Sequence, residues 1–189
     1  MYIIPGYGES HKKQSGYKDI AKMCTERGIK PIHVSIDWHA KGRKHFEKYI
    51  SQFLRQYKKP KDAKIYVLGF SYGAMIAFLS EPITRPDALI LCSLSPYFKE
   101  DLKTLKPSWL TWWNANFKDS DYSFNKLAPK IKTRTFLIAG DNEGPELARR
   151  VRLAKRMIRN SSRVTVKGAK HNVSRKKYLS AVGNIIEKL

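Results

Sequence analysis

The chain alternates short apolar runs with longer segments that have one apolar and one polar face. The apolar runs predict six strands, at Tyr2–Ile4, Pro31–Ile36, Lys64–Phe70, Ala88–Ser93, Thr135–Ala139 and Arg163–Val166. The segments between them predict helices near Tyr17–Arg27, Arg43–Tyr57, Tyr72–Ser80, Pro145–Asn160 and Ser174–Leu189. Strands that alternate with helices pair in parallel, with helices on both faces of the sheet. We therefore predict an α/β, doubly wound, mainly parallel six-stranded sheet.

The predicted helix at Pro145–Asn160 has the clearest two-sided pattern. At about 100° per residue, one side carries Leu147, Val151, Ala154 and Ile158. The other side is basic, with Arg149, Arg152, Lys155, Arg156 and Arg159. The simpler interpretation of this basic stripe is a solvated helix face. The alternative is docking to nucleic acid or to another anionic surface.

Length and composition favour one domain spanning residues 1–189. The 189 residues are 42% hydrophobic and 12% aromatic, which is enough for a packed core and excludes a disordered basic tail. The longest stretch without a charge, Ile65–Ser80, is too short for a membrane span and contains two glycines. The beginning of the chain lacks a charged segment before its apolar run, so we expect no signal peptide.

Cysteine content and charge bear on compartment and partners. Cys24 and Cys92 are the two cysteines, too few for a disulfide framework, which predicts a cytoplasmic protein. The net charge of +21 comes from 37 Lys and Arg against 16 Asp and Glu. Nucleic acid is a conceivable partner but is not favoured, because zinc-ligand spacings, phosphate-binding loops and RNA-binding aromatic patterns are missing from the sequence.

One segment interrupts the alternation. Between Pro96 and Pro129 the sequence predicts no strand, although the segment holds three of the four tryptophans. Ser108 is a candidate cap for a short helix whose aromatic residues recur at helical spacing: Trp109, Trp112, Trp113 and Phe117. We interpret the segment as an excursion from a single domain.

A candidate nucleophile lies where the third predicted strand meets the third predicted helix. The pentapeptide there is Gly69-Phe70-Ser71-Tyr72-Gly73, a G-x-S-x-G sequence. Glycines on both sides permit a turn too tight for side chains, which exposes the Ser71 hydroxyl at a helix N-terminus. The Tyr72 N–H is then free to bind an oxyanion. The alternative is that Ser71 merely caps the helix.

A serine nucleophile needs a base, and five histidines are available: His11, His33, His39, His45 and His171. His33 falls inside a predicted strand and His45 in a polar helical run, so structural or solvated roles suit them better. His171 follows the last predicted strand in a loop, at the sheet edge where the sites of such folds collect. It is the candidate base, although a loop histidine is otherwise usually solvated.

Two carboxylates compete to orient that base. The apolar strand that ends at Gly140 is followed by Asp141 and Glu143. Asp is the commoner residue in this role, whereas the longer Glu143 side chain could reach back to His171. Either one could instead stabilise the N-terminus of the following helix.

This ordering of strand, G-x-S-x-G, helix, acid and histidine resembles the α/β-hydrolase superfamily along nearly the whole chain. The resemblance is to its small, minimal bacterial-type serine hydrolases and esterases. It implies Glu143 as the acid, because the superfamily's acid commonly stands three positions past such a glycine. It also implies that Ile3-Ile4-Pro5-Gly6-Tyr7-Gly8 is the oxyanion loop, with the Tyr7 N–H as second donor.

The sequence differs from the superfamily pattern in two respects. Pro5 occupies the place of the usual histidine in the oxyanion loop, and the first two strands of the full fold have no counterpart. The resemblance therefore implies a truncated α/β-hydrolase fold. It also implies that the excursion at about 96–129 is a short helical lid over Ser71.

Together these features predict a serine hydrolase that cleaves a small ester or thioester through an acyl-enzyme. Trp109, Trp112 and Trp113 are predicted to line a pocket for an acyl or aromatic group, or else simply to cover the sheet. We expect no cofactor and no metal, and the sequence does not indicate an oligomeric state. The alternative is a catalytically silent protein of the same fold that binds an anionic partner through its basic surface.

Overall fold

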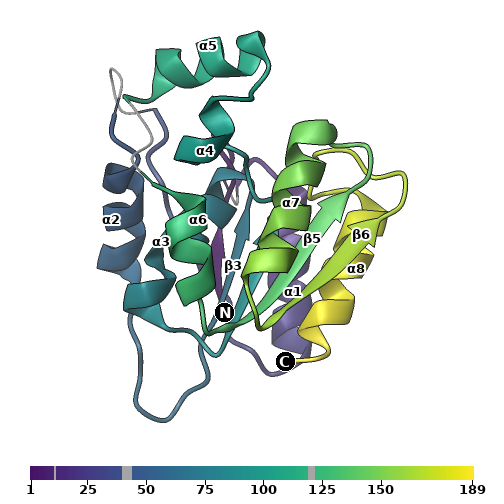
Figure 1. Cartoon of the computed structure of the whole chain (residues 1–189). Helices are drawn as coiled ribbons and strands as arrows, with labels where there is room; N and C mark the ends of the chain where they lie inside the picture. Colours follow the sequence, from purple (N-terminus) through teal and green to yellow (C-terminus); the bar gives the residue numbers. More distant parts are fainter. Residues whose placement is uncertain (11, 40–43, 119–121) are drawn as a thin grey trace.

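The computed structural model describes residues 1–10, 12–39, 44–118 and 122–189. Its strands form one parallel sheet in the order β2-β1-β3-β4-β5-β6 (Figure 1). The strands are β1 (Tyr2–Ile4), β2 (Ile32–His33), β3 (Tyr66–Phe70), β4 (Ala88–Cys92), β5 (Arg134–Gly140) and β6 (Ser161–Val166). All of the neighbouring strands pair in parallel because helices make the crossovers between them.

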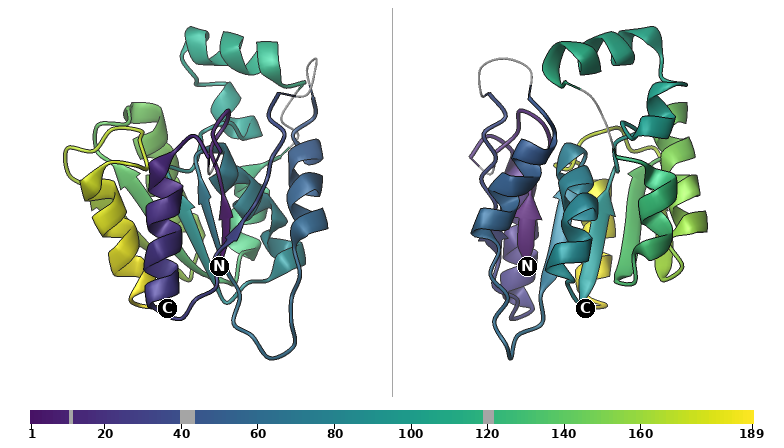
Figure 2. Two further views of the ribbon diagram at one scale, coloured as in Figure 1. Left: turned by 180° about the vertical axis from the view of Figure 1, so that it is seen from behind. Right: turned by 60° about the vertical axis from the view of Figure 1, so that its left-hand side comes forward.

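Helices cover both faces of the sheet (Figure 2). One face carries α1 (Ser15–Glu26) and α8 (Lys176–Ile186), and the other carries α2 (Glu47–Gln56), α3 (Tyr72–Thr84) and α7 (Pro145–Met157). Alternate residues of β3 show this division, since Val67 packs with α2 and α3 while Leu68 packs with α1 and α8. The predicted doubly wound α/β sheet is confirmed.

The second strand is shorter than predicted. Pro31–Ile36 was the expected strand, but only Ile32 and His33 pair with β1. Because β1 ends at Ile4, the chain beyond His33 soon has no neighbouring strand, and the N–H groups of Ser35 and Asp37 bond instead to glutamine side chains of α2. The helix predicted from Arg43 begins at Glu47, and Arg43 itself lies outside the described residues.

The predicted excursion contains three short helices and a 3₁₀ turn among its described residues, with residues 119–121 outside them. These elements are α4 (Lys99–Leu102), α5 (Pro107–Asn116), α6 (Phe124–Leu127) and the turn Ala128–Lys130. In Figure 1, α4 and α5 lie beyond the carboxyl ends of the strands. The predicted cap at Ser108 was wrong. Helix α5 begins at Pro107, whose fixed φ suits a first helical position, so Ser108 lies inside the helix and Lys106 occupies the cap position.

A buried arginine joins this segment to α7. Arg150 is 1% exposed, forms an ion pair with Asp101 and places its guanidinium 4.0 Å from the ring centre of Phe124. Burial raises the pKa of the Asp101 carboxyl, against the opposing effect of Arg150. Lys106 also lies 3.7 Å from Glu146 of α7. The segment is therefore fastened to the sheet layer by charged side chains.

The predicted basic stripe is exposed, with Arg149, Arg152, Lys155 and Arg156 on α7 and Arg159 just beyond its end at Met157. Arg150, which the stripe did not include, is the buried exception. In the described part of the chain, no helix has the length and apolar character needed to span a membrane.

Candidate active site

The candidate nucleophile sits on a strained turn between β3 and α3. Ser71 has φ 56° and ψ −116°, a backbone conformation that costs energy for any residue other than glycine. A Cβ at Gly69 would lie 2.2 Å from the Gly73 carbonyl oxygen, and one at Gly73 would lie 2.3 Å from the Ile4 carbonyl oxygen. Both flanking glycines are therefore required by close backbone approach. The Ser71 side chain makes no capping hydrogen bond to α3.

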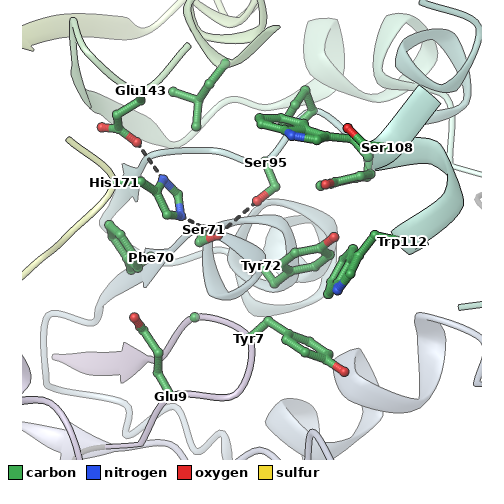
Figure 3. A pocket seen from close by; sticks show the side chains of 15 residues that line it. Tyr7, Glu9, Phe70, Ser71, Tyr72, Ser95, Ser108, Trp112, Glu143 and His171 are labelled. Carbon is green, nitrogen blue, oxygen red and sulfur yellow. Dashed lines mark hydrogen bonds and ion pairs between the residues drawn. The ribbon is translucent and has the colours of Figure 1, made fainter. Parts of the chain in front are cut away.

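Ser71, His171 and Glu143 form a hydrogen-bonded chain (Figure 3). The Nε2 of His171 lies 3.0 Å from the Ser71 Oγ, and its Nδ1 lies 2.6 Å from the Glu143 Oε2. Since an ionised carboxylate only accepts hydrogen bonds, Nδ1 carries the proton and Nε2 is left as an acceptor. The Ser71 hydroxyl can then donate to His171, which is the arrangement that makes a serine nucleophilic.

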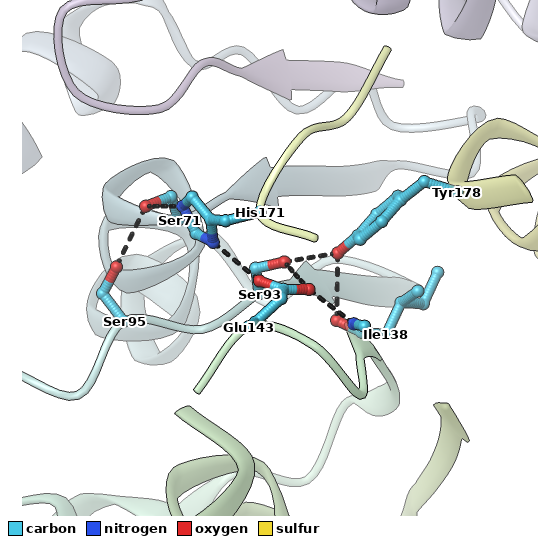
Figure 4. A network of polar contacts seen from close by, with 8 residues as sticks. Ser71, Ser93, Ser95, Ile138, Glu143, His171 and Tyr178 are labelled. Carbon is cyan, nitrogen blue, oxygen red and sulfur yellow. Dashed lines mark hydrogen bonds and ion pairs between the residues drawn. The ribbon is translucent and has the colours of Figure 1, made fainter. Parts of the chain in front are cut away.

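Glu143 is held by two residues at the ends of neighbouring strands, and a tyrosine of α8 supports one of them (Figure 4). Its Oε1 accepts hydrogen bonds from the Ser93 hydroxyl at 2.9 Å and from the Gly140 N–H at 2.5 Å. Ser93 Oγ lies 2.6 Å from the Tyr178 hydroxyl, which donates to the Ile138 carbonyl. The Glu143 side chain is fully buried, and these donors fix the orientation in which its carboxylate faces His171.

Asp141, the other candidate acid, points to a different partner. Its Oδ1 accepts a hydrogen bond from the Gly168 N–H at 2.7 Å, in the turn after β6. Asp141 is exposed, whereas Glu143 is buried against His171. Glu143 therefore contacts His171, whereas Asp141 contacts the backbone of the turn after β6.

Two backbone N–H groups are available beside Ser71. Tyr72 is the first residue of α3, where an N–H has no acceptor within the helix. Tyr7 lies in the loop after β1, and among the described residues neither its N–H nor that of Tyr72 donates a hydrogen bond. Both residues border the pocket that contains Ser71.

A tyrosine supports the loop after β1 that contains Pro5 and Gly6. The buried hydroxyl of Tyr17, from α1, accepts the Gly6 N–H at 2.8 Å and donates to the Glu9 carboxylate. Gln14 Nε2 donates to the other oxygen of Glu9 at 2.7 Å. Burial, together with the nearby Glu9 charge, raises the pKa of Tyr17 well above its usual value. The loop is thus held by a hydroxyl that stays neutral.

We expect the Tyr7 N–H in this loop to bind an oxyanion. Replacing Tyr17 by phenylalanine should then lower kcat by about tenfold to a hundredfold with little change in KM, because displacing such a donor affects mainly the transition state. Tyr57→Phe is the matched control, since it removes a 2.7 Å hydroxyl bond to the Thr84 carbonyl away from the pocket. Affinity for a trifluoromethyl ketone, which forms a tetrahedral adduct, should fall in parallel with kcat. Unchanged affinity and kcat would contradict this role for Tyr17.

The pocket above Ser71 has a volume of about 570 Å³, and its walls include six aromatic side chains. Residues that line it besides Ser71, His171 and Glu143 include Tyr7, Glu9, Phe70, Tyr72, Ser95, Tyr97, Trp109 and Trp112. The prediction that Trp113 lines it was wrong. The Trp113 indole is fully buried and stacks on Tyr97 and Phe117 at 4.8 and 4.5 Å, because successive helical residues face different sides of α5.

The contrast between two tryptophans of α5 can be measured. Trp113→Ala should lower the free energy of unfolding by about 3–5 kcal/mol, because it leaves a large cavity in the core. Trp109→Ala should cost clearly less, since Trp109 is only partly buried at the pocket wall. Urea denaturation of both variants checks this prediction, and equal losses would contradict it.

The sequence analysis missed several polar residues of the site. Ser95 Oγ lies 3.1 Å from Ser71 Oγ, Ser93 holds Glu143, and Glu9 borders the pocket. Ser93 and Ser95 follow directly on apolar β4, which neighbours β3, so their position at the end of an adjacent strand was an available signal. Among the described residues, no group of three His, Cys, Asp or Glu side chains is placed to hold a metal ion.

Neither a family model nor a curated protein sequence matches this chain. Solved structures do match. Est1E from Butyrivibrio proteoclasticus has a TM-score of 0.78 at 16% identity, covering 99% of this chain and 86% of its own. MGS-MChE2, an α/β hydrolase enzyme from the metagenome of lagoon sediments at Mar Chica, Morocco, has a TM-score of 0.74 at 18% identity, covering 99% and 88%. The chain has the α/β-hydrolase fold.

The same fold relates the chain to MenH from S. aureus, with a TM-score of 0.70 at 15% identity over 99% of this chain and 92% of that one. Est1E has also been solved with ferulic acid bound. Within the α/β-hydrolase fold of this chain, Ser71 lies on the turn after β3 and His171 in the loop after β6.

Proposed function

We propose that this protein is a serine hydrolase that cleaves a small ester or thioester through an acyl-enzyme. The observation that carries the proposal is the hydrogen-bonded chain from Ser71 through His171 to buried Glu143, at a pocket of about 570 Å³. Each member can take the role that acyl transfer requires of it, as nucleophile, base and orienting acid.

In the first half of the reaction, Ser71 Oγ attacks the acyl carbon while His171 Nε2 takes its proton. The carbonyl oxygen becomes an oxyanion, and the free N–H groups of Tyr7 and Tyr72 stabilise it. His171 then donates the proton to the leaving oxygen or sulfur, whose bond to the acyl carbon breaks. Glu143 holds the imidazole in the required tautomer and stabilises its positive charge.

In the second half, a water molecule gives a proton to His171 and attacks the acyl carbon of the Ser71 ester. Collapse of the second tetrahedral intermediate returns the proton to Ser71 and releases the acid. Trp109 and Trp112, on the segment above the strands, form an apolar wall that suits an aromatic or short aliphatic acyl group. Ferulic acid bound to Est1E is an aromatic acid in a protein of the same fold, which supports this acyl preference.

Reaction of the wild-type protein with a fluorophosphonate probe tests the proposal, together with hydrolysis of short p-nitrophenyl esters. We expect stoichiometric labelling, located at Ser71 by mass spectrometry of the labelled peptide, and loss of labelling after heat denaturation. No labelling and no hydrolysis would overturn the proposal. Salt-sensitive retention on heparin would then favour the alternative, a silent protein of this fold that binds anions through its basic surface.

A further inference from the structure

A carboxylate that forms no ion pair with the described basic residues borders the pocket. Glu9 lines the pocket wall and is partly exposed to it. Within the described residues, no Lys, Arg or His forms an ion pair with Glu9, although the chain has 37 Lys and Arg against 16 Asp and Glu. In so basic a protein, an unpaired carboxylate at the candidate active site calls for a functional explanation.

The neighbours of Glu9 leave part of its hydrogen-bonding capacity free. Tyr17 donates to one carboxylate oxygen and Gln14 to the other, and both donors are neutral. A carboxylate offers about four acceptor positions, so about two remain for a ligand. The two neutral donors also hold the Glu9 carboxylate in one orientation. This reduces the side-chain entropy that would otherwise be lost when a ligand binds.

Glu9 lies at the same end of the pocket as His171. A Cβ added at Gly6 would lie 2.8 Å from Glu9 Oε2 and 3.1 Å from Phe70 Cδ1. The Glu9 carboxylate and the Phe70 ring are therefore both close to Gly6. The Phe70 ring centre is in turn 4.8 Å from that of His171. In Figure 3, these three side chains lie on one side of Ser71, and Tyr72 and Trp112 lie on the other.

Position relative to His171 decides which part of a substrate meets Glu9. His171 must reach the leaving atom to protonate it, so the leaving group extends toward the His171 end and the acyl group toward Trp112. A carboxylate with free acceptor positions is a favourable environment for an ammonium group, through charge attraction.

We propose that Glu9 forms a leaving-group subsite for a cation, so that the substrates are esters or thioesters of ammonium-bearing alcohols or thiols. This inference rests on the proposed function of the same pocket. The net charge of +21 repels cations from the molecule as a whole. Glu9 therefore supplies a local attraction for such a substrate at this end of the pocket, and removing its charge weakens that attraction.

Two aryl esters of matched shape test the subsite by hydrolysis. They are 4-(trimethylammonio)phenyl acetate and its neutral counterpart 4-tert-butylphenyl acetate. Their intrinsic reactivities differ, so the measured quantity is the ratio of kcat/KM for the cationic to the neutral ester, compared between wild type and Glu9→Gln. Gln keeps the side-chain volume and an acceptor for Tyr17. We expect the ratio to fall about fivefold to tenfold in the variant, whereas an unchanged ratio would overturn the subsite.

A binding measurement separates failure of the subsite from failure of the proposed function. Phenyltrimethylammonium and tert-butylbenzene are titrated while the fluorescence of the pocket tryptophans is followed, which needs no turnover. Wild type should bind the cation more tightly than the neutral compound, and Glu9→Gln should lose that preference. Equal affinities in wild type would overturn the inference even if esters are hydrolysed. A preference for the cation without hydrolysis or labelling would support the subsite and overturn the serine hydrolase.

Discussion

Replacing Ser71 by alanine is expected to lower kcat for p-nitrophenyl ester hydrolysis by about six orders of magnitude. The variant keeps the pocket, the oxyanion donors and His171, but it has no atom that can form the acyl-enzyme, and members of such a catalytic group fail together rather than additively. Progress curves at high enzyme concentration, compared with the uncatalysed rate, measure the loss. The variant should fold, since Ser71 makes no capping bond to α3.

The matched control for this variant is Ser95→Ala. It removes a hydroxyl of the same kind whose oxygen lies 3.1 Å from that of Ser71. Because Ser95 only hydrogen-bonds to the nucleophile, its loss should cost about tenfold or less, on the scale of one neutral hydrogen bond. If Ser71→Ala kept a hundredth of the wild-type rate, the assignment of Ser71 as nucleophile would fail.

The second large effect is expected at the acid. Glu143→Gln should lower kcat by about 10⁴-fold, because the amide can donate to Nδ1 and so favour the tautomer whose Nε2 cannot accept the Ser71 proton. Steady-state kinetics measure this loss, with the unfolding midpoint as a check that the buried site still forms. Gln keeps the side-chain volume and an oxygen for Ser93 and Gly140.

Asp141→Asn is the control for the acid. It makes the same chemical change two residues away, on a side chain whose partner is the Gly168 N–H. An asparagine oxygen can still accept that bond, so kcat should change by less than about threefold. A large loss at Asp141 with none at Glu143 would reverse the assignment of the two carboxylates.

The parts of the site that could be predicted are those with a local signature. The two glycines around Ser71 can be read directly from the sequence, because they belong to one short turn. A side chain at either position would collide with the backbone of that turn or of β1. The choice between Asp141 and Glu143 was different. Both follow the same strand at nearly the same place, and only the path of the loop after β6 determines which carboxylate meets His171.

Residues that act through distant partners could not be predicted. Tyr17 meets Gly6 only because α1 packs under the loop after β1, and Tyr178 meets Ser93 across 85 residues of chain. Trp113 and Trp112 are adjacent and chemically identical, yet one is in the core and the other at the pocket. Their spacing predicts a helix, but the side of it that faces the pocket depends on how α5 docks.

The sequence by itself determined the alternation of strands and helices, and from it the parallel sheet that the structure confirms, because hydrophobic periodicity is a local property that survives any docking of the elements. It also singled out Ser71, His171 and two carboxylates as candidates for chemistry. Only the tertiary structure decided which of these groups meet. The hydrogen bonds from His171 to Ser71, at 3.0 Å, and to Glu143, at 2.6 Å, depend on the register of β3, β5 and β6 and on the loops that follow these strands. No single segment of the sequence encodes that arrangement. The same packing placed Glu9 at the wall of the pocket that contains Ser71.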